Sequence, residues 1–144
     1  MSPRLDGRLF LDTSFSIALA VKADAYHDRA LALMQQVFAE RPQLVTTRSV
    51  LLEIGDRLGK ARNRPKAVQA LMALESDPLV QIVPLSDALY DHAFQLFQAR
   101  PDKEWGMTDC VSFVVMRELR MTSALTADRH FEEAGFRALL REEK

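Results

Sequence analysis

The sequence predicts an α/β protein, a three-layer α/β/α sandwich built on a central, mostly parallel sheet of four to five strands. Short apolar runs alternate with longer stretches of helical periodicity, which is the pattern of a parallel sheet covered by helices on both faces. The 144 residues are enough for one hydrophobic core and fit a single domain over 1–144. A content of 48% hydrophobic and 27% charged residues is that of an ordinary globular protein.

One strand and two helices are predicted before residue 42. The apolar run 8–11 ends at an Asp-Thr-Ser triplet, which is typical of a buried strand that turns into a helix. Apolar positions then continue at helical spacing over 15–21. A second helix is expected to begin at Asp24 and to end before Pro42, because proline lacks the backbone N–H that a helix needs.

The middle of the chain predicts two more helices and two more strands. The run 44–47 is short and rich in β-branched residues, which indicates a strand, and Ser49 is expected to open the helix after it. A further helix begins near Pro65, a residue suited to a first turn, and ends at Pro78. The apolar run 80–85 predicts the third strand.

The last third of the chain supplies the remaining layers of the sandwich. Ser86 is predicted to cap a helix, and a loop over 100–107 precedes another helix that Thr108 is expected to cap. The run 122–126 predicts the fourth strand, and 136–140 a fifth strand at the edge of the sheet.

Composition excludes several classes of protein. The net charge of −1 lacks the basic excess of proteins that coat nucleic acid, so a nucleic-acid site would have to be local. The single cysteine, Cys110, excludes an intramolecular disulfide framework and a cysteine-based zinc site. No apolar run approaches the ~18 residues of a membrane span, and the N-terminus has no secretory segment. We therefore expect a cytoplasmic protein that does not bind membranes.

Four acidic residues follow or flank the predicted strands. Asp12 follows the first strand, Asp128 follows the fourth, Asp109 lies in a first helical turn, and Glu53 lies beside the apolar face of its helix. Each has an ordinary alternative explanation as a helix cap, a first-turn acid or a partner of a nearby arginine. In a parallel sheet, however, the carboxyl ends of the strands meet at one edge, where ligands bind.

Several carboxylates at one edge repel one another unless a cation neutralises them. Oxygen ligands without cysteine or paired histidine favour Mg²⁺ or Mn²⁺ over Zn²⁺. The sequence therefore predicts a Mg²⁺ or Mn²⁺ site, and it leaves open whether one or two ions bind.

Three motifs carry a resemblance to a known family. The segment 11–14 (Leu-Asp-Thr-Ser), the segment 107–113 (Met-Thr-Asp-Cys-Val-Ser-Phe) and the segment 125–131 (Leu-Thr-Ala-Asp-Arg-His-Phe) resemble the motifs of PIN domains, with Glu53 on a helix between the first two. They are most similar to the VapC-type toxins of bacterial toxin–antitoxin pairs. Over nearly the whole chain, the order and spacing of the motifs match.

The resemblance implies a metal-dependent endoribonuclease in which metal-activated water cleaves RNA. It implies that the catalytic and metal-binding residues are Asp12, Glu53, Asp109 and Asp128, and that Thr13, Ser14 and Thr108 orient water or phosphate. It further implies two protein partners, an antitoxin and a second copy in a homodimer. A PIN-like module that binds RNA or protein without cleaving it is the alternative.

For contacts with the substrate, the sequence offers several alternative residues. A basic run at 60–66 and the separate residues Arg48, Lys103 and Arg129 are alternative phosphate contacts. Trp105 is either a stacking platform for a base or a packing anchor.

Further alternatives concern other polar residues and the glycines. Asp91 is an acidic alternative to Glu53, although a solvated helix face explains it better. Cys110 is expected to be buried as a small apolar residue, and His130 either touches phosphate or has a surface or capping role. Gly55 and Gly59 either admit a partner chain or relieve crowding inside the domain.

Overall fold

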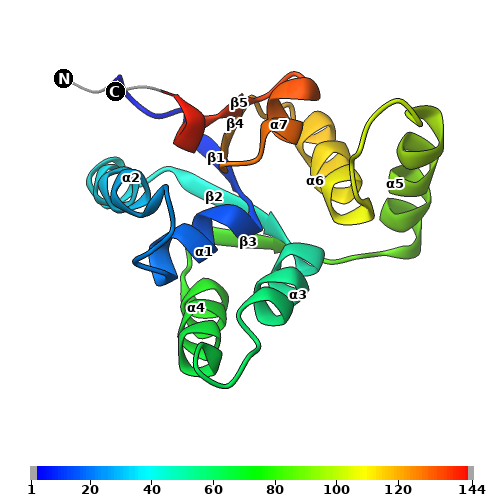
Figure 1. Ribbon diagram of the computed structural model, residues 1–144. Coiled ribbons are helices and arrows are strands. Elements are labelled where there is room, and N and C mark those ends of the chain that lie inside the picture. Colours follow the sequence, from blue (N-terminus) through cyan, green and yellow to red (C-terminus); the bar gives the residue numbers. More distant parts are fainter. Residues whose placement is uncertain (1–2, 143–144) are drawn as a thin grey trace.

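A computed structural model describes residues 3–142 and contains the predicted parallel sheet (Figure 1). Its five strands all run parallel, in the order β3-β2-β1-β4-β5. The strands are β1 (Arg8–Leu11), β2 (Gln43–Thr47), β3 (Val80–Val83), β4 (Ser123–Leu125) and β5 (Arg137–Ala138). The predicted α/β class and the fifth, edge strand are both confirmed.

Seven α-helices flank the sheet in the described part of the chain. They are α1 (Thr13–Ala20), α2 (His27–Glu40), α3 (Arg48–Arg57), α4 (Arg64–Ser76), α5 (Asp87–Ala99), α6 (Met107–Glu118) and α7 (Arg129–Glu133), and a 3₁₀ turn, η1 (Leu139–Arg141), ends that part. None of these helices is long and apolar enough to cross a membrane.

Alternation along the strands divides the core into two halves. Leu9 and Leu11 of β1 pack in a cluster with residues of α1 and α2, whereas Phe10 packs on the other face with residues of α3 and α6. Successive strand residues point to opposite faces, so a central strand such as β1 must be apolar on both sides to fill both halves. This is why Leu9, Phe10 and Leu11 form a continuous apolar run.

Two helices begin one residue before the predicted cap. Thr47, and not Ser49, caps α3, because its hydroxyl accepts the N–H of Val50 at 3.1 Å. Gly106, and not Thr108, is the residue before α6. The start of α2 also differs, since Asp24 forms a turn ahead of the helix.

The order of the strands determines where a ligand can bind. β1 lies between β2 and β4, and the chain leaves it toward β2 first and reaches β4 only after α6. Parallel sheets bind ligands outside the carboxyl ends of the strands at such a point, where the order of strands reverses. The residues that follow β1 and β4 are therefore the first to inspect.

Candidate metal site

Asp12 and Asp128 follow the neighbouring strands β1 and β4, and both also cap helices. Asp12 comes directly after β1, and its N–H donates to the carbonyl of Leu125 at the end of β4 (3.2 Å). Its carboxylate accepts the N–H of Ser14 in the first turn of α1. Asp128 caps α7 in the same way through the N–H of His130 (2.9 Å). Asp12 and Asp128 therefore cap helices and also lie at the same edge of the sheet, so the two explanations do not exclude each other.

Asp12 is a buried carboxylate with an altered pKa. The residue is only 5% exposed, and its Oδ2 accepts hydrogen bonds from Thr126 Oγ1 at 2.8 Å and Ser14 Oγ at 3.0 Å. Burial raises its pKa to about 6, an effect that these hydrogen bonds oppose and the nearby charges of Asp109 and Asp128 reinforce. A carboxyl group in this position becomes fully charged only above the usual acidic range.

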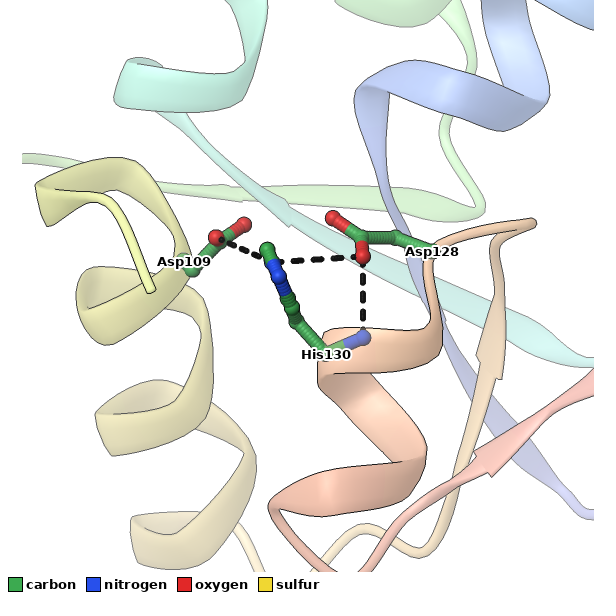
Figure 2. A group of neighbouring side chains, drawn as sticks. All are labelled: Asp109, Asp128 and His130. Atoms are coloured by element: carbon green, nitrogen blue, oxygen red, sulfur yellow. Dashed lines mark hydrogen bonds and ion pairs between the residues drawn. The ribbon is translucent and has the colours of Figure 1, made fainter. Parts of the chain in front are cut away.

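Asp109 and Asp128 face each other across an imidazole (Figure 2). The Nδ1 atom of His130 lies 3.2 Å from Asp109 Oδ2 and 3.3 Å from Asp128 Oδ1. One ligand atom from each of the three residues lies within 4.8 Å of the other two, which is the spacing of a group that can share a cation. Burial also raises the pKa of Asp109, and the charge of Asp128 adds to this, while the N–H of Gly106 and His130 act in the opposite direction.

Glu53 joins this site through a hydroxyl group and lies outside the group of Asp109, Asp128 and His130. Its Oε1 accepts a short hydrogen bond from Thr13, the residue after Asp12. Glu53 also lines a groove of about 340 Å³ between α3 and α6, to which Thr108 contributes. The structure thus brings Glu53 next to the strand edge from the side of α3.

The residues predicted to bind substrate lie in different environments. The hydroxyl of Thr13 donates to Glu53, and that of Ser14 donates to Asp12 and accepts the N–H of Ala127 at 2.9 Å. Both hydroxyls therefore orient residues of the protein itself. Thr108 lines the groove, and the exposed Arg129 lies 3.8 Å from Glu133.

The contacts of Thr126 and His130 with the acidic residues were not predicted from the sequence. The Thr126 hydroxyl donates to Asp12 and accepts the N–H of Asp128 at 3.0 Å, so it links the two acidic residues. A threonine at the end of a strand gives no sequence signal for this role. The spacing of His130, two residues after Asp128, was the available signal, but it does not indicate that the imidazole reaches Asp109 on α6.

Trp105 is a packing anchor, and the stacking alternative is wrong. It is 4% exposed, its Nε1 donates to Glu133 at 3.0 Å, and its ring packs edge-on against Phe113. Cys110 is buried as expected, and burial raises the pKa of its thiol to about 11, so it stays protonated. A thiol in that state is a poor nucleophile.

The Gly55 position faces α4 of the same chain. A Cβ atom there would lie 3.8 Å from the side chain of Leu71, whereas one at Gly59 would come within 2.7 Å of the carbonyl oxygen of Gly55. The glycines therefore meet neighbouring parts of the domain, which favours the crowding alternative over a partner chain at this face.

The basic residues predicted to contact phosphate lie in different parts of the structure. The run 60–66 covers the turn between α3 and α4 and the first residues of α4, beyond the end of α3 that is farther from the sheet edge (Figure 1). Arg48 pairs with Glu75 on the surface. Asp91 is exposed on α5, as its solvated interpretation predicts.

The acidic residues suit a hard divalent cation. Among residues 3–142, no lysine or arginine lies within ion-pair distance of Asp12, Glu53, Asp109 or Asp128. Buried carboxylates without a cationic partner are destabilising, and carboxylate oxygens are the ligands that Mg²⁺ and Mn²⁺ prefer. The donor set therefore fits such an ion.

Fold and site together define a parallel α/β protein with a cluster of acidic residues at the carboxyl edge of its sheet. The model of the PIN domain family matches residues 9–137, and the chain belongs to that family. The 23S rRNA-specific endonuclease VapC20, in two strains of Mycobacterium tuberculosis, is 29% identical over 128 residues, which are 89% of this chain and 95% of the relative.

A solved structure agrees with this relationship. The crystal structure of Mycobacterium tuberculosis VapC20, a toxin that cleaves the sarcin–ricin loop, superimposes with a TM-score of 0.78 at 29% identity. The match covers 89% of this chain and 95% of that one. The chain is thus VapC-like over most of its length, and the relationship indicates nuclease activity.

Proposed function

We propose that this protein is a Mg²⁺- or Mn²⁺-dependent endoribonuclease and the toxin of a toxin–antitoxin pair. The observation that carries the proposal is the group of Asp109, Asp128 and His130 at the sheet edge, with the buried Asp12 linked to Asp128 through Thr126, in a chain whose PIN-domain match spans residues 9–137. The whole chain, 1–144, acts as one domain in this proposal, and it works in the cytoplasm.

The four acidic residues hold the ion in this proposal: Asp12, Glu53, Asp109 and Asp128. A divalent ion would polarise the phosphoryl oxygens and lower the pKa of bound water, so no side chain has to act as a nucleophile. The chain's own hydroxyls fix the acids: Ser14 and Thr126 hold Asp12, and Thr13 holds Glu53. Side chains held in this way need little reorganisation when the ion and the substrate bind.

RNA is the proposed substrate because the curated relative acts on 23S rRNA and the solved relative cleaves the sarcin–ricin loop. Thr108 lines the groove next to Glu53, and Arg129 stands exposed on α7 one residue after Asp128, so both can meet a backbone phosphate near the acids. The overall charge gives no general attraction to RNA. Binding should therefore depend on this local region and on the bound ion.

The proposed partners are a cognate antitoxin and a second copy of the chain. The relationship to a VapC toxin supports the antitoxin, and the resemblance of the motifs to VapC-type toxins supports the homodimer. Co-expression with a candidate antitoxin should yield a stable complex that suppresses cleavage.

The decisive experiment measures cleavage of RNA by the purified protein. A sarcin–ricin loop oligonucleotide and total ribosomal RNA are incubated with the wild type and with Asp109→Asn, with Mg²⁺, with Mn²⁺ and with a chelator. Metal-dependent cleavage by the wild type alone supports the proposal. Binding of RNA without cleavage in any metal would instead support the catalytically silent module.

A further inference from the structure

We infer that His130 is itself a ligand of the metal ion, contributing its Nδ1 nitrogen beside the carboxylates of Asp109 and Asp128. This inference rests on the proposed function, because it requires that the site binds a divalent ion. It adds a nitrogen donor to a site that the sequence describes as purely acidic, and it changes the expected preference among metals.

The distances at the site support this assignment. An octahedral ion with bonds of roughly 2.1 Å places neighbouring donor atoms roughly 3.0 Å apart and opposite donors roughly 4.2 Å apart. Nδ1 of His130 lies 3.2 Å from an oxygen of Asp109 and 3.3 Å from one of Asp128. The three ligand atoms all lie within 4.8 Å of one another. These separations are those of donors around one ion, with the nitrogen next to both oxygens.

The position of the imidazole is fixed by local structure. The N–H of His130 donates to Asp128 Oδ1 at 2.9 Å, which holds the residue in the first turn of α7. Its side chain is 21% exposed, and its ring lies between Asp109 on α6 and Asp128 (Figure 2). If Nδ1 binds an ion, the proton must reside on Nε2, since a neutral imidazole carries only one N–H.

A competing explanation is that His130 acts as a built-in cation that pairs with the two carboxylates. The two explanations differ in the effect of removing the ring. If His130 is a ligand, removing its ring weakens metal binding. The loss should be greatest for Mn²⁺, because imidazole suits transition metals whereas Mg²⁺ prefers oxygen. If His130 is instead a cation that competes with the metal, removing its ring strengthens the binding of both metals.

The direct test uses Mn²⁺ as a spectroscopic probe bound to the wild-type protein. Electron spin-echo envelope modulation detects a nitrogen coordinated to the ion, and we expect this nitrogen signal in the wild type. His130→Asn, which lacks the ring, should lose the signal, and His92→Ala should retain it because His92 lies on the exposed side of α5, near Glu118. Circular dichroism verifies that each variant is folded.

Metal affinities supply a second readout that does not depend on cleavage. Titration calorimetry should give at least about a tenfold loss of Mn²⁺ affinity in His130→Ala and a much smaller loss for Mg²⁺. Mn²⁺ bound without a nitrogen signal, or tighter binding of both metals in His130→Ala, would refute the ligand role while leaving the proposed nuclease intact. Failure of the wild type to bind either metal would overturn both.

Discussion

Asp12→Asn should stabilise the metal-free protein at neutral and alkaline pH. Burial raises the pKa of Asp12 from 3.8 to about 6, so the folded state resists the charge that the unfolded chain accepts readily. Protonated Asp12 therefore makes its full favourable contribution to the free energy of unfolding below pH 3.8. This contribution is lost as the pH rises through about 6. Above that range, the charged carboxylate lowers the free energy of unfolding by about 3 kcal/mol, taking 1.36 kcal/mol per pKa unit.

Urea denaturation in the presence of a chelator measures this effect. An asparagine side-chain oxygen can still accept from Ser14 and Thr126, so we expect Asp12→Asn to gain up to about 3 kcal/mol at pH 8 and less than about 1 kcal/mol at pH 4. The exposed acid Asp91 on α5 provides the control, and Asp91→Asn should change stability little at either pH. An Asp12→Asn variant no more stable than the wild type at pH 8, or equally stabilised at both pH values, would refute the reasoning.

Three further predictions address activity, metal binding and the hydroxyl link. Asp109→Asn should abolish metal-dependent RNA cleavage, measured on gels, while its circular dichroism spectrum stays native. Mg²⁺ or Mn²⁺ at about 100 times its dissociation constant should stabilise the wild type by about 2.7 kcal/mol, read as a rise in melting temperature that Asp109→Asn lacks. Thr126→Val should lower the free energy of unfolding by about 1–3 kcal/mol, because it leaves the N–H of Asp128 without its acceptor; an unchanged urea midpoint would contradict this.

The fold could be predicted because its signals are local. A strand buried on both faces reads as a short apolar or β-branched run, as β1 and β2 do after their first residues, and the helices between strands carry helical periodicity. The exact helix starts could not be predicted in the same way. Thr47 and Ser49 are both good caps, and only the three-dimensional path of the chain makes Thr47 the one that accepts the N–H of Val50.

In the candidate site, too, some features could be predicted from the sequence and others could not. The positions of Asp12 and Asp128 follow from strand ends alone, since parallel strands bring their carboxyl ends to one edge. The contact between His130 and Asp109 depends on how α6 packs against α7, and the link through Thr126 depends on the neighbouring strands β1 and β4. Such contacts join residues that are far apart in the chain, and no periodicity in the sequence indicates them. The catalytic roles of the acidic residues stay predictions for the assays above.

Folding alone does not explain why residue 12 is an aspartate. Asparagine and serine cap helices about as well as aspartate does, and either would avoid a buried charge at this position. Asp12 is 5% exposed and lies near two other acidic residues, so the carboxylate destabilises the metal-free fold. Asp6 has the opposite effect, because it is exposed and the hydroxyl of Ser123 lowers its pKa. The proposed ion would explain the unfavourable charge of Asp12, because metal binding requires the charged form that folding opposes.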